Sequence, residues 1–190
     1  MTVPEDAKGL VIFAHGSGSS RLSPRNTHAA EAPNRRRLAT LQFDLLTDTE
    51  AMDRANVFDI PLLGRHVVET VRWAPEDESS GELPIGLFGG SIGVAPLIAA
   101  AELPQYVSAV VSRGGRPDPA GPVLGRVCAR MLLIVGGFDD VMIELNQQEL
   151  KALTCEKKLS IVPGVTHLFE ERGTLDQVIV AAGDLVRSAS

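Results

Sequence analysis

The sequence predicts one α/β domain built on about six mostly parallel strands with helices on both faces. Short apolar runs alternate with segments of helical periodicity along the 190 residues, which is the pattern of βαβ crossover units. Most of these runs are apolar without interruption, as expected for strands that helices cover on both sides. No linker is long or biased enough to divide the chain. Residues 1–190 are therefore expected to form a single domain, with a flexible N-terminus over residues 1–8.

The predicted strands are short segments that are rich in aliphatic side chains and in Phe. They are Leu10–Ala14, Ala39–Phe43, Ile85–Phe88, Ala109–Ser112, Met131–Val135 and Lys158–Val162. Polar or Pro- and Gly-rich segments at 75–84 and 113–122 are expected to be loops.

Helical periodicity occupies most of the intervals between these strands. Amphipathic or buried helices are predicted at Asp59–Trp73, Ile92–Glu102, Ile143–Leu153 and Thr174–Arg187. Asn26–Arg37 should form the first crossover helix, although Pro33 disfavours a continuous helix there.

The composition argues against several classes of partner. The formal net charge is −6, and an acidic chain does not attract phosphate backbones, so nucleic acid is not an expected partner. No stretch approaches the ~20 apolar residues of a membrane span, and the acidic N-terminus lacks the apolar core of a signal peptide. A cytoplasmic protein is therefore expected. Cys128 and Cys155 have neither metal-ligand nor redox-motif spacing and are interpreted as small buried residues.

The segment Gly89-Gly90-Ser91-Ile92-Gly93 matches Gly-x-Ser-x-Gly, the nucleophile elbow. A predicted strand ends just before it and a predicted buried helix begins within it. Glycines on both sides of Ser91 would let strand and helix approach closely, and the tight turn would push the serine hydroxyl out at the sheet edge. A plain glycine-rich turn is the alternative interpretation. A dinucleotide-binding loop is disfavoured because the Gly-x-Gly-x-x-Gly spacing is absent.

A serine hydroxyl needs a base to take its proton and a carboxylate to orient that base. His167 follows the last predicted strand, where a loop could bring it to Ser91. Asp139 and Asp140 follow the preceding strand, and parallel sheets gather their sites at this edge. We predict a triad of Ser91, His167 and Asp139, with Asp140 as the alternative carboxylate. His28 and His66 lie in predicted helices and are interpreted as structural or surface residues.

The first predicted strand runs into His15-Gly16-Ser17-Gly18, a loop of nearly bare backbone. The backbone amides of Ser17 and Ile92 are predicted to stabilise the oxyanion of a tetrahedral intermediate, with His15 shaping the loop by hydrogen bonds. A flexible Gly/Ser loop is the alternative, and a phosphate loop is disfavoured because no Lys-Ser/Thr follows at the required spacing. A metal site is the chemical rival. Its candidate ligands are His15, His28, Asp44 and Asp59, but their spacing matches no metal motif, so no metal is expected.

These motifs resemble the α/β-hydrolase superfamily, and within it the dienelactone-hydrolase-like group, over nearly the whole chain. Four runs are similar to a compact bacterial serine esterase subgroup, whose members occur alone or fused to phosphoribosyltransferase-like domains. These runs are His15–Arg21 with Ser23–Asn26, Phe43–Thr47, Ser112–Asp118 and Thr166–Glu170. The resemblance implies a minimal α/β-hydrolase fold, a Ser-Asp-His triad, no organic cofactor and activity on carboxylic esters, commonly with short acyl chains.

The chain also departs from the family pattern. Dienelactone hydrolases proper carry a cysteine nucleophile, whereas this elbow holds Ser91, which favours simple esters over dienelactone. The family's N-terminal antiparallel strands are not expected before Leu10, and no large cap is expected because no insertion is long enough for one. The site should therefore be open and covered only by loops. Those loops hold Arg21 and Arg113, which could contact an acidic substrate group, although structural ion pairs are the simpler interpretation.

The predicted partner is a small ester, and the sequence does not distinguish a monomer from a homodimer. Acyl transfer, or lactone or thioester cleavage, by the same triad is one alternative function. A binding module on a hydrolase fold is a second, which the complete set of candidate triad residues disfavours.

Overall fold

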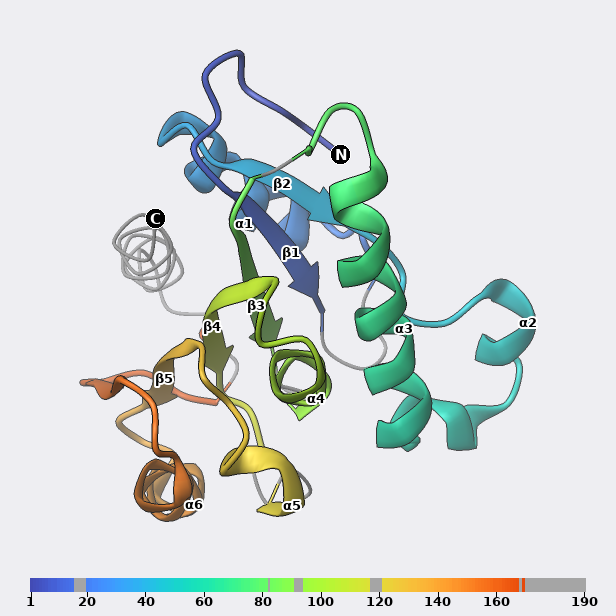
Figure 1. Ribbon diagram of the computed structural model, residues 1–190. Coiled ribbons are helices and arrows are strands. Elements are labelled where there is room, and N and C mark those ends of the chain that lie inside the picture. The colour runs from blue at the N-terminus through green and yellow to red at the C-terminus, as the bar shows by residue number, and fades with distance from the viewer. Residues whose placement is uncertain (16–19, 82, 91–93, 117–120, 168, 170–190) are drawn as a thin grey trace.

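A computed structural model describes residues 1–15, 20–81, 83–90, 94–116, 121–167 and 169 (Figure 1). Its centre is a six-stranded sheet in the order β2-β1-β3-β4-β5-β6, in which every neighbouring pair is parallel. Within the described ranges no helical domain is inserted above the sheet. The predicted fold class is therefore confirmed.

All six predicted strands form, with small changes at their ends. They are β1 (Leu10–Ala14), β2 (Ala39–Gln42), β3 (Ile85–Gly90), β4 (Val107–Arg113), β5 (Arg130–Gly136) and β6 (Lys157–Val162). Strands β3 and β4 continue past their apolar cores because Gly89 and Gly90 pair with Ser112 and Arg113. Hydrophobicity could not predict Gly89, Gly90 and Arg113 as strand residues, since their place in the sheet follows from backbone pairing.

The helices follow the predicted intervals between strands. The α-helices are α1 (Pro24–Arg35), α2 (Asp48–Ala51), α3 (Ile60–Trp73), α4 (Val94–Glu102), α5 (Gly121–Leu124) and α6 (Asp140–Ala152), and the 3₁₀ helices are η1 (Arg54–Phe58) and η2 (Ala74–Glu76). The predicted helix Thr174–Arg187 lies outside the described residues.

Capping side chains account for most differences from the predicted helices. Helix α1 begins at Pro24 because the Ser23 hydroxyl accepts the Asn26 N–H, and it ends soon after Pro33. Helix α6 begins at Asp140 because Asp139 caps it. The short α2 was not predicted, since a capping box around Thr47 defines it and no apolar periodicity marks it.

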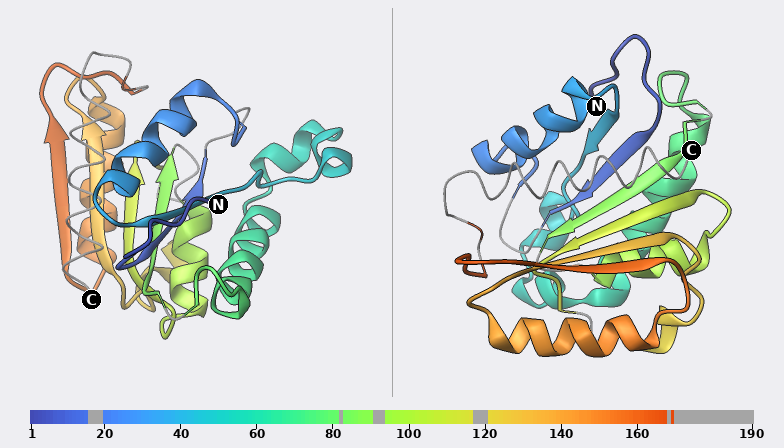
Figure 2. Two further views of the ribbon diagram at one scale, coloured as in Figure 1. Left: turned by 90° about the horizontal axis from the view of Figure 1, so that it is seen from above. Right: turned by 90° about the vertical axis from the view of Figure 1, so that its left-hand side faces the viewer.

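The strands divide the apolar interior into two layers. Alternate residues of β1 point to opposite sides, with Leu10, Ile12 and Ala14 in one cluster and Val11 and Phe13 in the other. The first cluster packs under α3, α4 and α5, and the second packs under α1. The right-hand view of Figure 2 shows α1 and α6 on opposite sides of the sheet. Because the strands are parallel, their carboxyl ends meet at one edge, and loops from both layers converge there.

The two cysteines lie at the opposite, amino-terminal edge of the sheet. Cys128 is exposed and Cys155 is half-buried, so the interpretation of both as buried residues was wrong. Each precedes its strand by a few residues, and β5 pairs with β6 from Met131 and Lys157 onward. Cys155 still packs against the edge of the first apolar cluster, whereas Cys128 faces solvent.

The N-terminal residues contact the edge strand. Thr2 forms an isolated antiparallel bridge with Thr40 of β2, with both backbone N–H···O distances at 2.9 Å. Among the described residues, no helix has the length and apolar character needed to cross a bilayer.

Candidate active site

The imidazole of His167 and the carboxylate of Asp139 meet at the carboxyl edge of the sheet. The distance from His167 Nδ1 to Asp139 Oδ2 is 2.7 Å. The Asp139 side chain is mostly buried, at 17% exposure, whereas His167 retains 39%. A proton on Nδ1 that is donated to Asp139 leaves the Nε2 lone pair able to accept another proton. The pair has the arrangement of a general base that is oriented by a carboxylate.

Asp139 has a second structural role, which positions its carboxylate. It is the N-cap of α6, and its Oδ1 accepts the Met142 N–H at 3.3 Å. One oxygen is therefore held by the helix while the other contacts His167. Asp140, the alternative carboxylate, is exposed in the first turn of the same helix.

The loop that carries His167 folds back over the end of β5. The Phe138 N–H donates to the Val165 carbonyl at 3.0 Å. A Cβ on Gly136 would lie 2.5 Å from that carbonyl oxygen and 2.6 Å from the Thr166 carbonyl oxygen. This close approach requires glycine, because real Cβ atoms do not come so near to backbone oxygens. Glycine at position 136 thus lets the loop reach the carboxyl edge.

The predicted nucleophile and both predicted oxyanion donors, Ser91, Ile92 and Ser17, lie outside the described residues. The described residues on either side of Ser91 and Ile92 do form the expected elements: β3 ends at Gly90, paired with Arg113 of β4, and the buried helix α4 begins at Val94. The strand before the Gly-x-Ser-x-Gly segment and the buried helix after it are thus both present. The roles of Ser91, His167, Asp139, Ser17 and Ile92 in catalysis stay predictions.

Asp44 contacts a residue on each side of the segment 16–20 that follows β1. Its Oδ1 lies 3.2 Å from His15 Nε2 and accepts the Arg21 backbone N–H at 2.8 Å. Its Oδ2 accepts a 2.8 Å hydrogen bond from the Arg21 guanidinium. Arg21 therefore forms the structural ion pair that was the simpler interpretation. Sequence reasoning considered Asp44 as a metal ligand and missed this role, because its partners come from a distant loop.

The other histidines have structural partners. His66 Nδ1 lies 2.6 Å from the Leu45 carbonyl oxygen, and its Nε2 lies 3.4 Å from Glu50. His28 is exposed on α1, 3.9 Å from Glu31. Asp59, a candidate metal ligand, instead caps α3 through the Leu62 N–H. In the part of the chain that the structure describes, no three His, Cys, Asp or Glu side chains converge as metal ligands.

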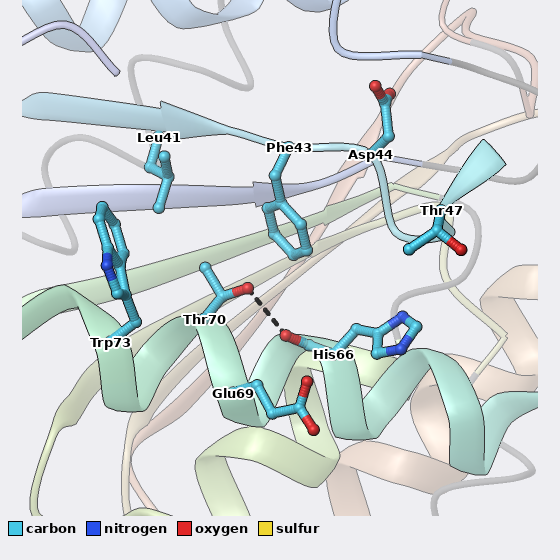
Figure 3. Close-up of a pocket in the computed structure, with 8 residues that line it drawn as sticks. All are labelled: Leu41, Phe43, Asp44, Thr47, His66, Glu69, Thr70 and Trp73. Carbon is cyan, nitrogen blue, oxygen red and sulfur yellow. Dashed lines mark hydrogen bonds between the residues drawn. The ribbon is translucent and has the colours of Figure 1, made fainter.

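A shallow cavity of about 440 Å³ lies between the end of β2 and α3 (Figure 3). Its wall is mainly apolar, and on the α3 side the Thr70 hydroxyl donates back along the helix to the His66 carbonyl oxygen at 2.8 Å. The lining residues are Leu41, Phe43, Asp44, Thr47, His66, Glu69, Thr70 and Trp73. None of them is a predicted catalytic residue.

The whole described fold has a close counterpart among solved structures. The chain is 47% identical to dienelactone hydrolase from Anabaena variabilis, and the alignment covers 96% of this chain and 87% of that one with a TM-score of 0.93. This chain belongs to the dienelactone hydrolase family. The family resemblance predicted from the sequence motifs is thereby confirmed.

More distant structures share the fold of this dienelactone hydrolase family member. Est1E from Butyrivibrio proteoclasticus is 16% identical, with a TM-score of 0.79 over 97% of this chain and 89% of that one. At this identity the likeness concerns the fold alone. No protein-family model matches the chain.

Two curated relatives of this family member come from strains of Mycobacterium tuberculosis. Each is 52% identical over 185 residues, which is 97% of this chain but 42% of the relative. Both carry the provisional name phosphoribosyl transferase. The chain thus spans less than half the length of the curated relatives it matches.

Proposed function

We propose that this chain is a serine carboxylesterase that hydrolyses small carboxylic esters with short acyl chains. The observation that carries the proposal is the 2.7 Å contact between His167 and Asp139 at the carboxyl edge of the sheet. Strand β3 ends at the same edge, and the residue after it is Ser91. A nucleophile, a base and an orienting carboxylate are the components of acyl transfer through a covalent intermediate.

In the proposed mechanism, the Ser91 hydroxyl attacks the ester carbonyl carbon. His167 Nε2 takes the serine proton, and the imidazolium is stabilised by the Asp139 carboxylate through Nδ1. The tetrahedral intermediate collapses, its bond to the alkoxy oxygen breaks, and His167 returns the proton to the leaving alcohol. Water then attacks the acyl-enzyme with His167 again as base, which releases the acid and restores Ser91.

The negative charge on the tetrahedral intermediate needs fixed donors. We assign this role to the backbone amides of Ser17 and Ile92. The contacts of Asp44 with His15 and Arg21, which flank Ser17 in the sequence, support this assignment, because an oxyanion hole depends on donors that do not need to reorganise during the reaction.

The proposed substrates are simple esters, and lactones are the second candidate. The name of the Anabaena relative favours lactone cleavage, and the same triad would open a lactone by the same steps, with the alcohol retained on the product. The phosphoribosyl transferase name belongs to proteins of which this chain matches 42%, so the proposal for residues 1–190 does not include that reaction.

A fluorophosphonate probe tests the proposal without knowledge of the natural substrate. It should label the protein at one residue, which peptide mapping should identify as Ser91. Ser91→Ala should abolish labelling and lower hydrolysis of a short p-nitrophenyl ester by roughly 10⁵–10⁶, with an unchanged circular dichroism spectrum. Labelling at another residue, or substantial activity in the folded variant, would refute the assignment.

A further inference from the structure

The end of strand β4 lies at the carboxyl edge of the sheet but has no role in the proposed mechanism. Strand β4 ends in Arg113, followed by Gly114 and Gly115, inside one of the runs that carries the family resemblance. These three residues, here termed the β4 terminus, lie between the strand that leads to Ser91 and the loop that carries His167. Their contacts reach both.

Arg113 contacts the end of the nucleophile strand. It pairs with Gly90 in the register of β3 and β4. A Cβ on Gly90 would lie 2.9 Å from a guanidinium nitrogen of Arg113, so the guanidinium occupies the space beside the residue that precedes Ser91.

Arg113 also contacts the histidine loop through Phe169. Its guanidinium carbon lies 5.7 Å from the centroid of the Phe169 ring, within the range of a cation–π contact. Phe169 is 3% exposed and packs in the same apolar cluster as Phe88 and Val111. Its N–H donates to the Thr166 carbonyl at 3.3 Å and closes a turn around His167. A group that holds Phe169 therefore holds this turn.

The two glycines continue the same support. Gly114 has φ +57°, and a Cβ there would lie 3.6 Å from His167 Cε1, so the imidazole rests against this backbone. The Gly115 carbonyl accepts a 3.1 Å hydrogen bond from Nδ2 of the fully buried Asn146 on α6. Helix α6 is therefore connected to the imidazole in two ways. Asp139, which caps the helix, contacts His167 directly, and Asn146 holds the β4 terminus against which the imidazole rests.

We infer that Arg113 is a positioning residue, which holds the His167 loop against the end of β3 by contacting Phe169 and Gly90 together. The inference rests on the proposed function for its catalytic consequence. A planar guanidinium suits this place because it can lie flat against a ring and a glycine, whereas a lysine ammonium is a point charge on a flexible stem. Arg113 then acts through the imidazole and does not contact substrate.

Arg113→Met and Arg113→Lys test the inference, with Arg130→Met as the matched control. Arg130 is also a strand-terminal arginine, but it lies at the opposite edge of the sheet and pairs with Glu156 at 3.0 Å. We expect Arg113→Met to lower kcat by about 10–100-fold, because small displacements of a catalytic group have effects of this size. KM should change little for a neutral ester and for one that carries a carboxylate. Arg130→Met should retain wild-type kcat.

Phe169→Leu extends the test. If Arg113 acts through the ring, Phe169→Leu lowers kcat similarly, and the double variant with Arg113→Met is no worse than either single change. Additive losses would contradict the coupling. An increase in KM confined to the carboxylate-bearing ester would overturn the inference in favour of substrate binding by Arg113.

A readout without catalysis separates the inference from the proposed function. The proton between His167 Nδ1 and Asp139 should give a downfield proton NMR resonance in the wild type and in Arg130→Met. Arg113→Met should broaden or shift it, and Arg113→Lys and Phe169→Leu provide the same comparison if Arg113→Met does not melt cooperatively. An unchanged resonance would refute positioning by Arg113. A wild type that hydrolyses no ester but shows these spectral changes would refute only the esterase proposal.

Discussion

His167 Nδ1 lies 2.7 Å from Asp139 Oδ2, although the two residues are 28 positions apart in the sequence. Asp139 is held by the first turn of α6 and His167 by a loop folded over Gly136, so the contact depends on two adjacent strand ends. A side chain that caps a helix has little freedom to turn away. The geometry of α6 thereby sets the direction from which the imidazole is held.

Asp139→Asn should lower kcat far more than Asp140→Asn does. An amide at position 139 disfavours the imidazole tautomer with its proton on Nδ1 and removes the charge that stabilises the imidazolium, and comparable replacements lower kcat by about 10⁴-fold. Asp140 is exposed and should tolerate the change with a less than about threefold effect. Steady-state kinetics on one short ester would compare them, and a greater loss at Asp140 would reverse the assignment.

Gly136→Ala should lower activity by displacing the histidine loop. The added methyl group would meet the Val165 and Thr166 carbonyl oxygens at 2.5 and 2.6 Å, so the loop must move. We expect a loss of about 100-fold in kcat. Gly125→Ala is a suitable control because nothing lies within 4 Å of its added Cβ. Equal kinetics in the two variants would show that the loop position is not important for turnover.

Asp44→Ala should loosen the loop that follows β1. The change removes the contact to His15 and both hydrogen bonds from Arg21. If this loop supplies an oxyanion donor, kcat should fall by about 10–100-fold with a smaller effect on KM. Asp48→Ala, a change in the exposed first turn of α2, should retain activity. Retained kcat in Asp44→Ala would argue against an anchored oxyanion loop.

Glu149 should make stability depend on pH. It is 3% exposed on α6, and its Oε1 has no hydrogen-bond partner among the described residues. Burial raises the pKa of this carboxyl group from 4.5 to about 7, because the charged form loses its hydration. The folded protein therefore holds this proton more tightly than the unfolded chain. The contribution of Glu149 to stability is fully present below pH 4.5 and is lost as the pH rises to about 7, a change on the order of 3 kcal/mol.

Glu149→Gln tests this expectation by thermal melting between pH 5 and 8. The neutral amide should remove the contribution of residue 149, so the gain in Tm over wild type should grow as the pH rises. Glu144→Gln, at an exposed position on the same helix, should follow the wild type. A difference between Glu149→Gln and wild type that stays constant with pH would contradict the raised pKa.

The apolar runs by themselves predict the six strands, because a strand that is buried on both faces has a continuous run of apolar residues such as Val, Ile and Leu. The order Ser91, Asp139, His167 at predicted strand ends likewise brings the candidates to one edge, because parallel strands place their carboxyl ends together. Local caps such as Ser23 and Thr47 set helix limits that periodicity misses.

Tertiary structure alone decided the contacts between distant segments. The contact of His167 with Asp139, the assembly of His15 and Arg21 around Asp44, and the place of Arg113 between Gly90 and Phe169 depend on strand register and loop path. The burial of Glu149 and the exposure of Cys128 follow from the same packing. Patterns in a sequence report what each segment buries, whereas the partner of a polar side chain is set by the three-dimensional path of segments far along the chain.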